Sequence, residues 1–290
     1  MDYQISFPNL HIWLDHVGKN ISIFGFSIAY YGICIAIAML AGLAAARRYA
    51  KISGQDPELY LDLSLYLMVF GILGARIYYV IFRWKDYQGN LLSIFNLRQG
   101  GLAVYGGILA GVLTIFLYAG RKKENAFQML DTVGFGLLIG QVIGRWGNFF
   151  NREVFGGYTN GLLAMRLPVS AVRARDITKE LSEHLITADG IEYIQVHPTF
   201  LYEGIWNLCL FFLLWKFKEH KKYEGQLFLI YLLGYGVGRF WIEGIRTDQL
   251  MLTEHIAVSQ LLALICVIAS SGMLVFMKQK NKKMEDANEK

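Results

Sequence analysis

The chain is organised around residues 129–157, MLDTVGFGLLIGQVIGRWGNFFNREVFGG, where a long apolar run gives way abruptly to polar residues. The apolar part, Met129–Ile143, predicts a buried or membrane-spanning helix. The polar part, Gly144–Gly157, holds four glycines, two asparagines and a glutamate beside its arginines. An ionisable group at membrane depth costs about 2.5–3.5 kcal/mol and is seldom idle. The stretch therefore predicts a binding site, with a loop that merely closes a helix end as the alternative.

Composition indicates a membrane protein. The chain has 290 residues, of which 54% are hydrophobic and 14% aromatic, and only four prolines. The net charge of +5 comes from short basic clusters between apolar runs, a topological pattern that argues against nucleic acid as a partner. Cys34, Cys209 and Cys266 show no metal-binding or CxxC spacing and are interpreted as small buried hydrophobes. The first 25 residues alternate polar and apolar types, so no cleavable signal peptide is expected.

Seven stretches are long and apolar enough to cross a bilayer about 30 Å thick as helices. They lie near residues 27–46, 59–82, 101–120, 127–143, 199–215, 225–242 and 257–277. Nothing between them resembles a soluble linker or a repeat. The prediction is therefore an all-α polytopic protein with one membrane domain, residues 1–290.

The basic loops predict the orientation of these helices. Lysine and arginine gather at residues 47–51, 121–123, 216–222 and 278–283. All four clusters fall on one side of a seven-helix chain, and the positive-inside rule makes that side cytoplasmic. We therefore expect the amino terminus outside, the carboxyl terminus in the cytoplasm, and a multi-pass location in the cell membrane.

The long connection between the fourth and fifth segments predicts a small folded cap outside the membrane. Residues 162–166 and 191–196 have strand-like alternation, and residues 177–185 have a short helical pattern. The sequence thus favours an α/β cap over residues 158–197. An active face there would suit a partner that arrives through the outer leaflet of the lipid bilayer.

The sixth segment carries a polar stripe. Tyr235, Arg239, Glu243 and Arg246 recur at spacings of four, four and three, which stacks them on one helix face. A self-neutralising Arg239–Glu243 pair is one reading. In the other, Arg246 leaves excess positive charge on the stripe, and that excess calls for an anion.

Five further residues are candidates near the same predicted membrane face, each with a plainer alternative. Tyr105 stands among glycines and is either a pocket residue or an interfacial anchor. His197 and Glu203 open the fifth segment, where His197 is otherwise a simple cap. Arg76 ends the second segment, where snorkelling is the alternative, and Tyr31 opens the first.

Together these positions predict a site for a phosphate-bearing lipid. Arginine forks match phosphate oxygens in two-point contacts. The arginines expected to gather are Arg76, Arg145, Arg239 and Arg246, with Glu153, Glu203 and Glu243 as counter-charges. Neither HExxH nor a carboxylate cluster occurs, so we expect no metal and no cofactor.

Several of these motifs resemble those of one family. The pattern Gly144-Arg145-x-Gly147-Asn148-Phe149-x-Asn151-x-Glu153-x-x-Gly156 is similar to the signature of bacterial phosphatidylglycerol–prolipoprotein diacylglyceryl transferases. Further blocks resemble that family at 74–76, 197–203 and 239–246, and the resemblance covers about residues 20–275. It implies an enzyme that moves a diacylglyceryl group from phosphatidylglycerol to the lipobox cysteine of a preprolipoprotein. The products are a thioether and glycerol phosphate, in the first step of lipoprotein maturation.

The resemblance also assigns roles to individual residues. Arg145 corresponds to the lipid-binding arginine, Arg239 to a second functional arginine, and Tyr31 to an essential tyrosine. Glu153 and Glu243 correspond to supporting residues. The substrate-binding candidates are Arg145, Asn148, Asn151, Glu153, Gly156, Tyr31, Arg76, His197, Glu203, Tyr235, Glu243 and Arg246, and the catalytic candidates are Arg145, Arg239 and Tyr105.

Tyr105 departs from the family pattern, which has a histidine before two glycines and uses it as a proposed base. A tyrosine has a reference pKa near ~10 and is a poor base at neutral pH. Two rival functions stay open on the residues alone: a transporter of anionic lipids, although related halves are not seen, and a scaffold that binds lipid without turnover.

Overall fold

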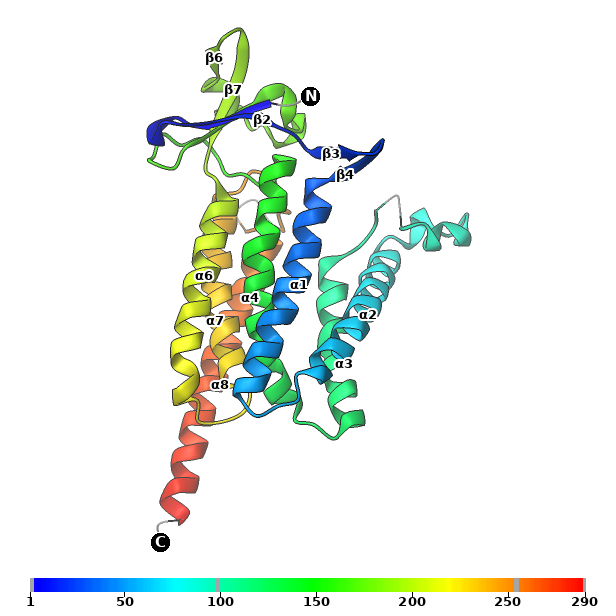
Figure 1. Ribbon diagram of the computed structural model, residues 1–290, viewed down its shortest axis with the longest axis vertical. Coiled ribbons are helices and arrows are strands. Elements are labelled where there is room, and N and C mark those ends of the chain that lie inside the picture. The colour runs from blue at the N-terminus through cyan, green and yellow to red at the C-terminus, as the bar shows by residue number, and fades with distance from the viewer. Residues whose placement is uncertain (1–2, 98–99, 253–255, 289–290) are drawn as a thin grey trace. The chain divides into compact units, whose positions relative to one another are not determined.

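The computed structural model describes residues 3–97, 100–252 and 256–288, with side chains from Gln4 to Asn281 within those ranges. This part of the chain is mostly helical (Figure 1). Its helices are α1 (Tyr30–Ile52), α2 (Glu58–Phe82), α3 (Val104–Lys122), α4 (Ala126–Asn151), α5 (Lys179–Glu183), α6 (Thr199–Phe217), α7 (Gln226–Gly244) and α8 (Val258–Asn288). Its strands are β1 (Tyr3–Phe7), β2 (Ile12–Val17), β3 (Asn20–Ile23), β4 (Phe26–Ala29), β5 (Met165–Pro168), β6 (Ile186–Ala188) and β7 (Ile191–Val196).

Each of the seven predicted segments contains a helix, but three of the predicted carboxyl ends are wrong. Helix α1 runs to Ile52, α4 to Asn151 and α8 to Asn288, each at least six residues past the predicted boundary. In α1 the extension carries basic residues at the helix carboxyl end, where cations complement the helix dipole. The side chains of Lys282 and Lys283 lie outside the described residues.

Six of the described helices are long and apolar enough to cross a membrane: α1, α2, α3, α4, α6 and α8. Helix α7 is not among them, although it has 19 residues. Its four glycines, its tyrosines and the Arg239–Glu243 pair lower its hydropathy. A membrane protein with several spans is therefore supported, whereas the count of seven crossings and their orientation stay predictions.

The chain divides into two compact units. One comprises Met1–Gly42, Phe135–Lys221 and Leu229–Lys290, and the other comprises Leu43–Gly134 and Lys222–Phe228. We call them the sheet unit and the hairpin unit, because the first contains the strands and the second the antiparallel pair α2–α3.

In the hairpin unit, small residues let α2 and α3 approach at backbone distance. A Cβ placed on Gly106 of α3 would lie 2.4 Å from the carbonyl oxygen of Gly74 of α2 and 2.3 Å from Cβ of Tyr78. Such close approach is how helices gain contact area in lipid, where the hydrophobic effect offers little. Glycines therefore let these two helices pack at backbone distance.

In the sheet unit, α4, α6, α7 and α8 pack on one another. Phe135 of α4 makes edge-on ring contacts with Phe211 and Trp215 of α6. Leu210 of α6 lies against Gly234 of α7, and Gly236 of α7 lies against the backbone of α8. Cys34 is buried as expected, but Cys209 and Cys266 are exposed on helix surfaces, so the interpretation of all three as buried is wrong.

A five-stranded antiparallel sheet lies at one end of these helices, and the carboxyl end of α8 lies at the other (Figure 1). Its strand order is β2-β1-β5-β7-β6. The predicted strands within residues 158–197 supply β5 and β7, and the predicted short helix contains α5. The sequence did not indicate that residues 3–17 add two strands to the same sheet.

The core of this cap joins the sheet to the helix ends. Its buried members are Ile5, Phe7, Phe149, Phe155, Met165, Leu167, Leu181, Ile194, Val196 and Phe200. Phe149 comes from α4 and Phe200 from α6, with their rings 5.0 Å apart. Because Phe149 and Phe150 are drawn into this core, α4 continues as a helix through the stretch expected to be a loop.

We expect Gly106→Ala to destabilise the protein by about 1–3 kcal/mol, because the added methyl overpacks the α2–α3 contact. Gly71→Ala on α2 is the matched control, since a Cβ there meets nothing within 4 Å. The melting temperatures of the two purified variants in detergent test this. Equal melting temperatures would contradict the close packing.

Candidate functional site

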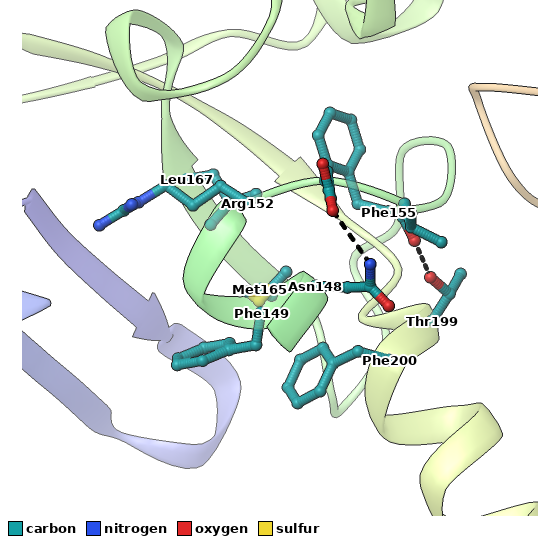
Figure 2. Close-up of a pocket in the computed structure, with 10 residues that line it drawn as sticks. Asn148, Phe149, Arg152, Phe155, Met165, Leu167, Thr199 and Phe200 are labelled. Carbon is teal, nitrogen blue, oxygen red and sulfur yellow. Dashed lines mark hydrogen bonds between the residues drawn. The ribbon is translucent and has the colours of Figure 1, made fainter. Parts of the chain in front are cut away.

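The site begins where α4 ends, in two left-handed turns of the backbone. Arg152 and Val154 have φ values of 55° and 61°, a region that a β-branched residue such as valine rarely adopts. The turns bring the Glu153 carboxylate back to the helix it has just left. Its Oε1 accepts hydrogen bonds from the amides of Asn148 and Asn151, both at 3.2 Å. Figure 2 shows the Asn148–Glu153 bond as a dashed line in the narrow pocket between α4 and the start of α6.

Arg152 fixes this turn from inside and was missed as a candidate. Its side chain is 2% exposed, and its guanidinium donates to the carbonyl oxygens of Phe150 and Val17. Val17 is the last residue of β2, so the buried arginine ties the amino-terminal strands to the end of α4. Its position within the glycine-rich stretch was the only sequence signal for it.

Positive charge surrounds Glu153. Arg173 donates to its second oxygen at 2.8 Å, and Lys19 lies within electrostatic range of Arg152, Arg173 and Glu153. Burial lowers the pKa of the Lys19 ammonium, the two arginines lower it further, and Glu153 opposes them. Of these three cations, Arg173 pairs directly with Glu153, whereas Lys19 and Arg152 lie near the pair.

Arg145, one turn before Asn148 on α4, starts a chain of ion pairs. It contacts Asn148 Oδ1 at 3.5 Å on one side and the Glu203 carboxylate of α6 on the other. Glu203 also accepts from Arg239 of α7 at 2.6 Å, and Arg239 reaches Glu243 at 2.5 Å. Glu203 is therefore shared by two arginines from two helices, and the pairing of Arg239 with Glu243 is only one link of a longer network.

The expected excess of positive charge on α7 is wrong. Arg246 contacts Glu243 at 3.1 Å, but it also binds both carboxylate oxygens of Asp248, each at 2.9 Å. Asp248, two residues further along, had not been considered. The three arginines Arg145, Arg239 and Arg246 are therefore balanced by three carboxylates.

Within the described residues the network remains open to a ligand at two points. The side chains of Arg145 and Arg239 are 19% and 17% exposed, whereas those of Glu203 and Glu243 are 5% and 3% exposed. In these pairs Glu203 and Glu243 are the buried partners, and Arg145 and Arg239 are the more accessible side chains. Tyr235 lies one turn from Arg239 on α7, and its ring stacks on that of Tyr231.

A separate cleft of about 410 Å³ opens beside Arg246, which is large enough for part of a ligand. Its walls include Tyr158, Glu180, His197, Arg246 and Gln249. Burial lowers the pKa of His197, with Glu180 opposing, so the imidazole is largely neutral at pH 7. Its Nδ1 lies 3.1 Å from the hydroxyl of Tyr202.

This arrangement, in which two asparagines at the end of α4 bind Glu153 and Arg145 pairs with Glu203, can be compared with known proteins. The family model described as prolipoprotein diacylglyceryl transferase matches residues 19–276. The chain belongs to this family.

Similar relatives are each named phosphatidylglycerol–prolipoprotein diacylglyceryl transferase. One from Clostridioides difficile (strain 630) is 41% identical over 261 residues, which cover 90% of this chain and 95% of the relative. One from Staphylococcus haemolyticus (strain JCSC1435) is 39% identical over 254 residues, covering 88% and 86%. One from Clostridium botulinum (strain Loch Maree / Type A3) is 39% identical over 270 residues, covering 92% and 97%.

In this member of the diacylglyceryl transferase family, Gly156 forms a backbone clasp. Its N–H donates to the His197 carbonyl at 3.0 Å, and that of Gly157 donates to the Ile245 carbonyl at 2.9 Å. A Cβ on Gly156 would lie 2.7 Å from Cβ of His197 and 2.8 Å from the oxygen of Ile245. Glycine is therefore needed here because three chain segments meet at backbone distance.

A second glycine also allows close packing: the ring of Tyr31 lies against Gly147 of α4, where an added Cβ would be 2.8 Å from the ring. The structure thus brings together, in the sheet unit, twelve of the predicted site residues. They are Tyr31, Arg145, Asn148, Asn151, Glu153, Gly156, His197, Glu203, Tyr235, Arg239, Glu243 and Arg246.

Arg76 and Tyr105 belong to the hairpin unit. Arg76 is 6% exposed, and its N–H donors reach the carbonyl oxygens of Ser93, Ile94, Asn96, Gly100 and Gly101 at 2.7–3.3 Å. A guanidinium has five N–H donors, so these contacts leave none for a phosphate. The alternative of a snorkelling arginine, with its charged end in water, does not fit either, because Arg76 is buried. Substrate binding by Arg76 and a catalytic role for Tyr105 stay predictions, and the contacts of Arg76 favour a loop-shaping role.

No group of three or more histidine, cysteine or carboxylate side chains among the described residues is placed to hold a metal ion.

We expect Gly156→Ala to abolish most activity and to lower the melting temperature, because the added methyl collides with His197 and Ile245. Overpacking of this kind costs about 1–3 kcal/mol. Gly157→Ala is the matched control, since its Cβ meets only a flexible carboxylate oxygen of Glu180 at 3.4 Å. A Gly156→Ala protein with the stability and activity of Gly157→Ala would refute the clasp.

Proposed function

We propose that the protein transfers the diacylglyceryl group of phosphatidylglycerol to the lipobox cysteine thiol of preprolipoproteins, the first step of lipoprotein maturation. Sulfur displaces the phosphate oxygen at the terminal glycerol carbon, so a carbon–sulfur bond forms as a carbon–oxygen bond breaks. The products are a thioether and glycerol phosphate, and the thiol proton passes to the surroundings. The observation that carries the proposal is the pairing of two partly accessible side chains, Arg145 and Arg239, with the buried carboxylates of Glu203 and Glu243.

Arg145 binds the lipid phosphate in this proposal. Its Nε faces Glu203 and its Nη1 faces Asn148, so the fork is held rigidly before the ligand arrives. A guanidinium held in this way matches two phosphate oxygens without further loss of side-chain freedom. Asn148, Asn151 and Glu153 keep the end of α4 in the shape that this contact requires.

Arg239 stabilises the charge that develops on the thiolate or on the leaving phosphate. Preorganised donors directed at developing charge are the largest single source of catalysis in many enzymes. A free thiol with a pKa of about 8.5 is only a few per cent thiolate at neutral pH, and a nearby guanidinium raises that fraction. Tyr105 donates a hydrogen bond or orients the substrate, since tyrosine is a poor base at pH 7.

The remaining parts of the site assist binding. Lys19, Arg152 and Arg173 leave net positive charge under the cap, which attracts an anionic headgroup. The cleft beside Arg246 and His197 offers room for the polar part of the acceptor peptide. Tyr31, Glu203, Tyr235, Glu243 and Gly156 complete the proposed substrate-binding set, and Arg76 shapes the loop whose carbonyl oxygens it binds.

Placement in the cell membrane follows from the same proposal. Helix α7 makes the seventh crossing, because its polar residues face the ion-pair network instead of lipid. The cap and the site then lie at the outer leaflet, with the carboxyl end of α8 in the cytoplasm. No cofactor or metal takes part.

Incubating the purified protein with phosphatidylglycerol and a synthetic lipobox peptide tests the reaction. We expect mass spectrometry to show a peptide heavier by one diacylglyceryl group, and no change in a peptide with serine in place of the cysteine. A lipid transporter or a binding scaffold would leave both peptides unchanged. An unmodified cysteine peptide would therefore overturn the proposal.

Arg145→Lys keeps the positive charge but loses the planar fork, so we expect at least about a 100-fold loss of transfer, as when an oxyanion donor is removed. Membrane insertion and expression should stay normal. Arg121→Lys, at an exposed position in the last turn of α3, is the control. Full transfer by Arg145→Lys in membranes would exclude a two-point phosphate contact at this residue.

A further inference from the structure

A second polar layer continues the ion-pair network into the helix bundle. Each of three network residues has a polar residue one helical turn away, on the side remote from the cap. Gln141 precedes Arg145 on α4, Asn207 follows Glu203 on α6, and Tyr235 precedes Arg239 on α7. Residues four apart share a helix face, about 6 Å apart along the axis. All six belong to the sheet unit.

The layer is bounded on its far side by apolar contacts. Phe211, one turn beyond Asn207, makes an edge-on contact with Phe135 of α4 at a ring distance of 5.8 Å. Leu210 is 7% exposed and packs on Gly234. Asn207 and Gln141 therefore lie between the charged residues and a more apolar part of the helix bundle.

Two polar atoms of this layer are buried without a hydrogen-bond partner among the residues that the structure describes. They are Nδ2 of Asn207, whose side chain belongs to a residue that is only 2% exposed, and Oε1 of Gln141. The Gln141 amide is otherwise fixed, because its Nε2 donates to the Tyr231 hydroxyl at 2.9 Å. The Asn207 N–H donors have no such anchor.

An unsatisfied buried polar group costs about 1–3 kcal/mol, and a leucine at position 207 would avoid that cost. A donor kept in such a place fits an acceptor that arrives with a ligand. The diacylglyceryl group has suitable acceptors: its ester carbonyls lie only a few bonds from the phosphate, on the acyl-chain side. A phosphate on Arg145 and Arg239 would place them about one helical turn deeper, at the level of Asn207.

We propose that Asn207 donates a hydrogen bond from Nδ2 to an ester carbonyl of the lipid donor, so that the site recognises diacyl rather than dialkyl glycerophospholipids. This inference rests on the proposed function, since it assumes that the lipid phosphate occupies the arginine edge. Asn207 is a specificity residue here, and the bond to be broken lies elsewhere in the lipid.

The test compares phosphatidylglycerol with its dialkyl ether analogue, which has the same headgroup but lacks the ester carbonyls. For the unaltered protein we expect a KM for the diester about 3- to 10-fold below that for the diether, with similar kcat, as one hydrogen bond of about 0.5–1.5 kcal/mol would give. Asn207→Leu should raise the diester KM to the diether value and leave the diether KM unchanged. Its melting temperature should not fall, because an unpaired amide has been removed.

Cys209→Ala on the same helix is the matched control, since Cys209 is exposed and outside the polar layer. It should keep the preference for the diester. Equal KM values for the two lipids with the unaltered protein would overturn the inference, even if Asn207→Leu failed to fold. An equal loss with both lipids in Asn207→Leu would instead assign Asn207 a purely structural role and also overturn it. Absence of any transfer by the unaltered protein would count against the proposed function, a distinct outcome.

Discussion

The alternation of guanidinium and carboxylate groups across α4, α6 and α7 is the interaction on which the rest of the site depends. Removing one partner from a buried ion pair costs about 3–5 kcal/mol, so each link holds its neighbours in place. Glu203 has the central position, because it contacts arginines from both other helices. The network also explains why α7 is less apolar than its neighbours, since its polar face is used inside the bundle and not against lipid.

Charge balance in the network changes how an anion is recognised there. With three arginines matched by three carboxylates, net attraction cannot hold a phosphate at this point. In the proposed function, directional contacts from Arg145 and Arg239 hold the phosphate instead. The long-range attraction comes from the underside of the cap, where Lys19, Arg152 and Arg173 outnumber Glu153. In this proposal the cap residues attract the anionic headgroup, and Arg145 and Arg239 orient it; both groups belong to the sheet unit.

The sequence predicted the helices and most of the residues that the structure gathers in the sheet unit, because hydrophobic runs and helix-face spacing are local properties. It could not predict contacts made across the chain. Asp248 became a partner of Arg246 only through a loop conformation, and β1 joined β5 across more than 150 residues. The polar residues after Ile143 predict a loop, but α4 continues to Asn151 because Phe149 on its other face packs in a core.

Arg76 and Arg145 show why residue type alone does not define a ligand contact. Both were expected to bind an anion, and both lie near helix ends rich in glycine. All five N–H donors of Arg76 bind backbone carbonyl oxygens. These oxygens could move only if the loop that carries them changed its conformation. Arg145 faces a carboxylate and an amide side chain, and its own side chain stays 19% exposed. An arginine that is paired with side chains and partly accessible can therefore bind an anion, whereas an arginine whose donors all bind backbone oxygens stabilises the fold.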